Sequence, residues 1–337
     1  MDDYVKEPYG GRYCDLLDPF EKFNRKELIA RFRFDEEGIS EIANLVEPHI
    51  ARETENKNRP LPAHIQVCAF LQYVARRPGQ LDVADTLQIS QPSVSRCVNN
   101  VSKGLCDVMD QFVKFPVGDE LANQMNKFHE IANFPMVVGA IDCTHVRIKM
   151  PSGSEEEKRQ YINRKRYPSI NVQGIVDGDG KFSSIYANWP GSCHDSFILQ
   201  QSNVWDAFES GYFNDCLLLG DGGYPCKPWL LTPYRVPVTP AQQQYNNAHS
   251  RTRNCVERVF GRFKSRFGML GAKVLLKPER ACRLIGACAV LHNLAIDLNM
   301  PDVEEYHDPF EPDIIYNGLE QDGLHFRDRF CLEMFSF

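Results

Sequence analysis

The sequence predicts an α/β domain preceded by an all-α domain, and two observations carry this prediction. Between about residues 35 and 133, apolar residues recur at three- and four-residue spacing, as on one face of a helix. From Met136 onward, the pattern changes to short continuous apolar runs bounded by turn residues, which is typical of buried strands. We therefore divide the chain into an N-terminal arm (1–34), a helical domain (35–133), an α/β domain (134–300) and an acidic C-terminal tail (301–337).

The arm and the first part of the helical domain have ordinary helix signals. The arm is aromatic and charged, and we expect it to contain a short helix. Asp35 precedes an apolar stripe in the way an N-cap residue does, and Pro62 opens a second helical pattern that Arg77-Pro78-Gly79 ends.

A helix-turn-helix pattern follows. It predicts a short helix over 81–87, a turn at 88–90, and a second helix that Ser90 caps. The first turn of the second helix carries polar residues that could face a DNA groove, namely Gln91, Ser93, Ser95 and Arg96. An ordinary helical bundle with a tight turn would give the same pattern, so two interpretations are open.

The α/β domain begins with three expected strands, over 136–141, 169–176 and 182–188. The sequence Asp-Gly-Asp-Gly at 177–180 predicts a hairpin turn between the second and third. A helix over 195–208 and a buried strand over 216–220 follow. Three antiparallel strands, a helix and a parallel strand form the core of an RNase H-like fold.

The end of the domain is expected to be a loop and two helices. Segment 222–250 holds five prolines, which we interpret as too many for regular structure and as a long loop covering the site. Helical spacing then predicts helices over 253–267 and 290–298.

Four acids lie at the ends of short apolar runs: Asp142, Asp195, Asp221 and Glu257. A carboxylate placed after a buried strand costs desolvation energy unless a positive charge neutralises it. Several such carboxylates brought together repel one another, and a divalent cation relieves the repulsion. The set therefore predicts a site for Mg²⁺ or Mn²⁺. Asp195 has a second interpretation, because it begins a predicted helix and could be an N-cap.

The charge is distributed unevenly. The tail holds ten Asp or Glu against two Arg, so the net charge of −7 leaves residues 1–300 near neutral, at +1. Basic residues cluster at 158–166 and 251–266, and such patches can bind a phosphate backbone. The candidates for DNA contact are Arg164, Lys165, Arg166, Arg253, Arg258 and Lys264. Each could instead form a structural salt bridge.

Composition narrows the class of protein. No apolar run is long enough to span a membrane, and twelve cysteines are scattered singly rather than in pairs typical of zinc sites. We therefore expect reduced cysteines and an intracellular protein. His145 and His194 could position water or phosphate, or pack structurally, whereas His292 is expected to be a core histidine.

The acids sit in strings that resemble those of the PIF/Harbinger DDE transposases, including the domesticated nuclease derived from them. The strings are Ile-Asp-Cys-Thr-His, Trp-Pro-Gly-Ser-x-His-Asp-Ser, Leu-Gly-Asp-Gly-Gly-Tyr, Asn-x-Val-Glu-Arg and Val-Leu-His-Asn-Leu. The resemblance spans residues 60–299, and the intervals between the strings fit as well as the strings do.

The resemblance implies a metal-dependent DNA endonuclease or transposase that uses two divalent cations. It places the metal-binding positions at Asp142, Asp195, Asp221 and Glu257, with Asp142, Asp221 and Glu257 catalytic. It also implies transposon-end DNA as the substrate and a Myb-like accessory protein as a partner. We further expect a homo-oligomer, with the protein in nucleus and cytoplasm. The alternative is a domesticated DNA- or protein-binding adaptor that keeps the fold without transposition.

Overall fold

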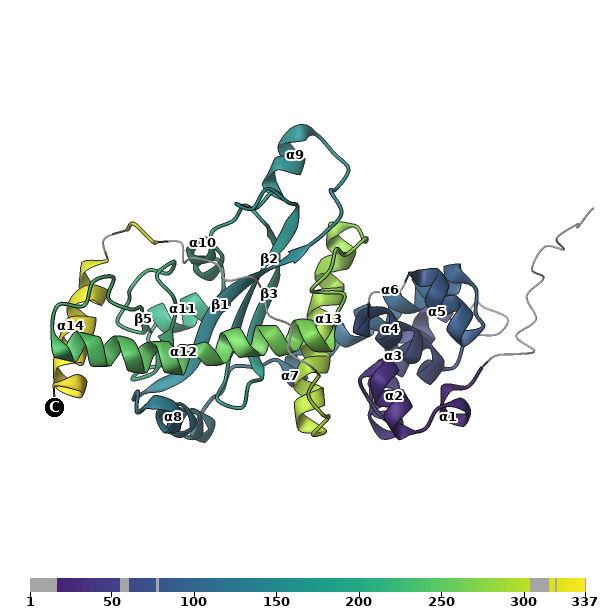
Figure 1. Cartoon of the computed structure of the whole chain (residues 1–337), viewed down its shortest axis with the longest axis horizontal. Helices are drawn as coiled ribbons and strands as arrows, with labels where there is room; N and C mark the ends of the chain where they lie inside the picture. The colour runs from purple at the N-terminus through teal and green to yellow at the C-terminus, as the bar shows by residue number, and fades with distance from the viewer. Residues whose placement is uncertain (1–16, 55–60, 77–78, 304–314, 319, 337) are drawn as a thin grey trace, which may run out of the picture. The chain divides into compact units, whose positions relative to one another are not determined.

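The computed structural model describes residues 17–54, 61–76, 79–303, 315–318 and 320–336, so most of the predicted arm lies outside the described residues. The chain divides into two compact units, 1–104 and 105–337 (Figure 1). This division falls before the expected boundary at 133. The reason is that α8 (Asp119–Ala132) packs against a strand of the second unit.

The described part of the first unit is helical. Leu28, Phe32 and Phe34 are buried, so residues 17–34 belong to the packed unit rather than to a separate arm. The helices are α1 (Pro19–Lys22), α2 (Arg25–Phe32), α3 (Glu36–Thr54), α4 (Ala63–Ala75), α5 (Gln80–Leu87) and α6 (Gln91–Asp107), the last of which continues past residue 104.

Helices α5 and α6 have the spacing that the sequence predicts. Gln88 ends α5 in the left-handed conformation, with φ of 54°, which turns the chain sharply. Ser90 begins α6, because its Oγ accepts a hydrogen bond from the Ser93 amide at 3.3 Å. Whether this pair reads DNA stays a prediction.

A five-stranded mixed sheet forms the centre of the second unit, in the order β3-β2-β1-β4-β5. Strands β1, β2 and β3 are antiparallel, β4 runs parallel to β1, and β5 runs parallel to β4. The strand directions match the sequence prediction, although β1 is longer than expected. The bounds are β1 (Val137–Arg147), β2 (Ser169–Val176), β3 (Phe182–Pro190), β4 (Leu217–Leu219) and β5 (Leu230–Leu231).

Helices pack on this sheet. The long helix α12 (Pro240–Arg266) crosses it against β1 and β2, and α13 (Pro278–Asp297) packs against β3 (Figure 1). The described part of the unit also contains four short helices, which are α7 (Met109–Phe112), α9 (Glu155–Gln160), α10 (Asp195–Gln200) and α11 (Asn203–Glu209). The single helix expected over 195–208 is therefore wrong. Ser202 breaks it, because its Oγ accepts from the Trp205 amide and caps α11.

The expected loop over 222–250 is wrong in two places, because strand β5 (Leu230–Leu231) lies inside it and a helix forms its last part. Helix α12 starts at Pro240, thirteen residues before the predicted helix at 253. Proline fits the first position of a helix, where no intrahelical amide bond is needed. Thr239 and Gln242 complete a capping box in front of it. Proline content alone was therefore a misleading signal.

Part of the segment that we expected to be an acidic tail is helical. Residues 321–335 form helix α14 (Gln321–Phe335), which packs against α12 and β5. Phe330 is buried and stacks on Phe134, with ring centroids 5.7 Å apart, and Phe335 contacts Tyr245 at 5.6 Å. This part of the tail is a component of the folded unit.

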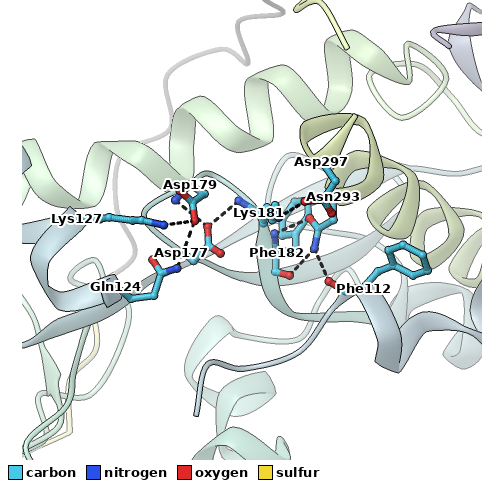
Figure 2. A network of polar contacts seen from close by, with 9 residues as sticks. All are labelled: Phe112, Gln124, Lys127, Asp177, Asp179, Lys181, Phe182, Asn293 and Asp297. Atoms are coloured by element: carbon cyan, nitrogen blue, oxygen red, sulfur yellow. Dashed lines mark hydrogen bonds and ion pairs between the residues drawn. The ribbon is translucent and has the colours of Figure 1, made fainter. Parts of the chain in front are cut away.

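The β2–β3 hairpin is anchored to two helices (Figure 2). Asn293 on α13 accepts from the Phe182 amide and donates to the Phe182 carbonyl, both at 2.8 Å. On the other side, Lys127 on α8 donates to Asp179 at 2.6 Å. Inside the turn, Asp177 Oδ1 accepts from the Asp179 and Lys181 amides at 2.9 Å. These contacts fix the position of β2, which borders the strand of Asp142.

Candidate active site

Asp142 and Asp221 are brought to one level by the parallel pairing of β1 and β4. Ala140 is aligned with Leu219, and each acid follows its aligned residue by two positions. Asp142 Oδ1 accepts from the Cys143 amide at 2.7 Å. Asp221 is 7% exposed, and its Oδ1 accepts from the Gly223 amide at 3.0 Å. The sheet therefore positions the first two acids, as the strand order predicts.

Glu257 reaches the site from α12, and a glycine allows the helix to come close. Gly174 is directly opposite Asp142 in the β1–β2 ladder. A Cβ at that position would lie 3.0 Å from Phe260 Cζ, and Phe260 is one turn after Glu257 on α12. The absence of a side chain at position 174 thus sets the distance between the helix and the sheet.

Arg253 joins Glu257 to Asp142. Its Nη1 lies 3.1 Å from Asp142 Oδ2, and its Nη2 donates to Glu257 Oε1. The Arg253 and Asp142 side chains are 13% and 19% exposed, whereas that of Glu257 is 51% exposed. From the sequence, we expected Arg253 either to contact DNA or to form a structural salt bridge. In the structure it forms salt bridges with Asp142 and Glu257.

Asp195 approaches from the opposite face of the sheet. Successive strand residues point to opposite faces, so Gln173 faces away from α12 when Gly174 faces it. Gln173 Nε2 donates to the Asp195 carbonyl at 3.1 Å, and Asn171 Nδ2 donates to Asp195 Oδ1 at 2.9 Å. Asp195 is also the first residue of α10, which follows His194 as its N-cap. The N-cap interpretation of Asp195 is therefore wrong.

The acids influence one another electrostatically. Burial is the main cause that raises the pKa of Asp142 to about 6. The positive charge of Arg253 acts against this shift, whereas the charges of Asp195 and Glu257 add to it. A nearby cation would therefore favour the charged form of Asp142.

Tyr224 is influenced by Asp221 as well as by Asp142 and Asp195. Burial is the main cause that raises the pKa of the Tyr224 hydroxyl well above its usual value. Cys143 raises it further, and the charges of Asp195, Asp142 and Asp221 act in the same direction. The Tyr224 hydroxyl accepts from Gln173 Nε2 at 3.3 Å. Its buried side chain thus lies within the electrostatic reach of three of the four acids.

The donor set suits a hard divalent cation, since all four side chains offer carboxylate oxygens, which Mg²⁺ and Mn²⁺ prefer. Within the described residues, however, no three His, Cys, Asp or Glu side chains are grouped closely enough to hold a metal ion. Two features account for this. Asp195 comes from the far face of the sheet, and the Arg253 guanidinium lies between Asp142 and Glu257.

Two of the expected DNA contacts are buried. Ser93 is 3% exposed, and its Oγ accepts from Arg96 Nη2 at 2.9 Å. Lys264 is also 3% exposed, and its Nζ donates to Thr144 Oγ1 at 2.7 Å and to the His145 carbonyl. The assignments of Ser93 and Lys264 to a DNA surface are therefore wrong. Both side chains fall on the inward side of their helices.

The other basic candidates are on the surface. Arg96 and Arg258 are exposed on α6 and α12. The cluster Arg164-Lys165-Arg166 is exposed in the loop after α9, where the buried Asn163 accepts from the Lys165 amide at 2.9 Å. The side chains of these residues are accessible to a ligand from solvent.

Sequence reasoning missed Asn171, Gln173 and Tyr224. Every residue of β2 is buried, yet polar Asn171 and Gln173 alternate there with Ile170 and Val172. Two amides on one face of a fully buried strand need polar partners. That alternation was the available signal for a polar site.

Comparisons with known proteins show the family to which the chain belongs. A family model described as DDE superfamily endonuclease matches residues 141–293. The Homo sapiens protein named "Putative nuclease HARBI1" is 37% identical, over 86% of this chain and 84% of its own length. The chain belongs to the DDE superfamily endonucleases. The Xenopus laevis protein of the same name is 30% identical over 92% of this chain and 90% of its own, and "Protein ALP1-like" of Arabidopsis thaliana is 24% identical over 98% and 80%.

Membership in the DDE superfamily endonucleases makes the chain a nuclease, and it confirms the Harbinger resemblance and the mixed α/β fold. The matched segment contains all four acids. No solved structure matches the chain. Among the described residues, the helices are all too short or too polar to cross a membrane.

Proposed function

We propose that this chain is a metal-dependent DNA endonuclease of Harbinger type, which cleaves phosphodiester bonds with two divalent cations, Mg²⁺ or Mn²⁺. The observation that supports it most is the placement of Asp142 on β1 and Asp221 just after β4 at the same level of the sheet. Arg253 joins Glu257 to Asp142, and the charge of Asp195 acts on Asp142 from the other face. Folding stability alone does not favour acids from separate elements at this level of the sheet, because their charges repel one another.

Each acid has a proposed duty that follows from its element. When bound, two divalent cations activate the attacking oxygen and stabilise the leaving 3′ oxygen. Asp142, on the central strand, would hold both cations, Asp221 one and Glu257 the other. Asp195 would bind directly or through water, and Asn171 keeps its carboxylate in place.

The remaining parts of the proposal concern DNA and partners. The helix-turn-helix of α5 and α6 would bind transposon-end DNA through Arg96, and the exposed cluster 164–166 with Arg258 would hold the backbone near the acids. Joining of strands, a Myb-like accessory protein, a homo-oligomer, and residence in nucleus and cytoplasm are further proposals. They rest on the Harbinger resemblance.

The deciding experiment is a plasmid-nicking assay with Mn²⁺, with and without a Myb-like protein. Alanine at Asp142, Asp221 or Glu257 should abolish nicking and leave the far-UV spectrum of the metal-free protein unchanged. Arg329→Ala, on the exposed face of α14, is the matched control and should nick normally. Undiminished nicking by Asp142→Ala would disprove the assignment.

A further inference from the structure

The site contains its own cation. The Arg253 guanidinium contacts Asp142 with one nitrogen and Glu257 with the other. A planar guanidinium is suited to this arrangement, because its nitrogens form a rigid fork that matches carboxylate oxygens. Glu257 is proposed to hold one metal ion, and Asp142 is proposed to hold that ion together with the second one.

Helix stability does not account for the arrangement. Arg253 precedes Glu257 by four residues, and in isolated helices the opposite order of charges is the more favourable one. The contact with Asp142 brings the arginine across to another element, 111 positions away in the sequence. Only 13% of the Arg253 side chain is exposed, so the charge is held largely away from water.

Two other basic side chains on α12 have different partners. His249, one turn earlier on α12, is buried against the Leu231 carbonyl and packs on Tyr245. Lys264, near the end of the helix, is directed to Thr144. Both side chains are therefore committed to other partners along the same helix.

We propose that Arg253 is a positioning residue that serves as the counter-ion of the metal-free site, and that it must leave at least one carboxylate before a divalent cation binds there. The proposal rests on the proposed function and adds a form of regulation to it. Arg253 keeps Asp142 and Glu257 near each other while no metal is present, and it competes with the metal for them. Once displaced, its guanidinium would turn toward the phosphate backbone of the substrate.

The test measures Mn²⁺ binding to the full-length protein without DNA, from the electron paramagnetic resonance signal of the free ion. Arg253→Ala removes the competitor, and we expect a Kd about tenfold lower than that of the wild type, which corresponds to about 1.4 kcal/mol. Its Tm in EDTA should fall, because two carboxylates then face each other unpaired. Arg253→Lys keeps the charge without the fork, and its Kd should lie between the two.

The control is Arg329→Ala, which removes an exposed arginine–glutamate pair with the same four-residue spacing on α14. It should change neither Kd nor Tm. Unchanged or weaker Mn²⁺ binding by both Arg253 variants, with binding still lost in Asp142→Ala, would overturn the counter-ion role and leave the nuclease proposal intact. If the wild type and both variants bind no Mn²⁺, the two proposals fail together.

Discussion

Replacing Gly174 by alanine tests how the sheet positions Glu257. The added Cβ would lie 2.9 Å from Phe182 Cε1 and 3.0 Å from Phe260 Cζ. Real Cβ atoms essentially never show the first distance and rarely show the second, and both neighbours are buried ring carbons. Phe182 is held by Asn293 through two backbone hydrogen bonds, so the ring on α12 is the one that must give way.

The expected cost follows from the packing. Overfilling a well-packed core by one methyl group costs about 1–3 kcal/mol. For a folded unit of this size, that cost should lower Tm by roughly 3–10 °C. A shift of α12 away from β1 should also separate Glu257 from Asp142, so nicking at a temperature well below Tm should fall more than the folded fraction does.

Thermal unfolding by circular dichroism and the Mn²⁺-dependent nicking assay measure the two effects. Gly222→Ala is the control for stability, because nothing lies within 4 Å of a Cβ at that position. A Gly174→Ala protein with wild-type Tm and wild-type nicking would refute the argument that this glycine sets the approach of α12.

The remaining predictions concern pH, DNA binding and the C-terminal helix. Burial lowers the pKa of His249 and of His292 to about 3, so both are neutral when folded and take up protons on unfolding below pH 6.5. The free energy of unfolding should therefore fall by roughly 1.4 kcal/mol for each histidine between pH 7.5 and 5.5, and urea unfolding of His292→Gln should show a smaller loss; an unchanged loss would contradict the assignment. Arg96→Glu should weaken DNA binding and reduce its salt dependence without changing Tm, as measured by fluorescence anisotropy; a lower Tm with intact binding would make α6 purely structural. Phe330→Ala should destabilise the protein by about 3–5 kcal/mol in chemical denaturation, because its ring is buried against Phe134, whereas Leu332→Ala, 64% exposed, should have little effect; equal stability of the two variants would argue against the packing of α14.

The sequence by itself predicted the mixed α/β class of the second unit and singled out four acids as candidates. Continuous apolar runs are typical of strands covered on both faces, and the observed strand directions agree with those expected from the sequence. Asp142 and Asp221 follow two such runs, so their proximity needed no knowledge of side-chain contacts. The helix-turn-helix spacing was likewise legible, because caps and turns are local features.

Tertiary structure decided which side of each element is buried and which charges meet. Ser93 and Lys264 look like surface residues in the sequence, but the packing of α6 and α12 turns them inward. Local composition also failed for residues 321–335, where a few buried aromatic side chains outweigh many acidic ones. The salt bridge from Arg253 to Asp142 joins a helix to a strand, and the two residues are 111 positions apart in the sequence. A local sequence pattern cannot predict a contact between residues so far apart. Burial and long-range contact are properties of the packed chain, so only the folded structure could assign them.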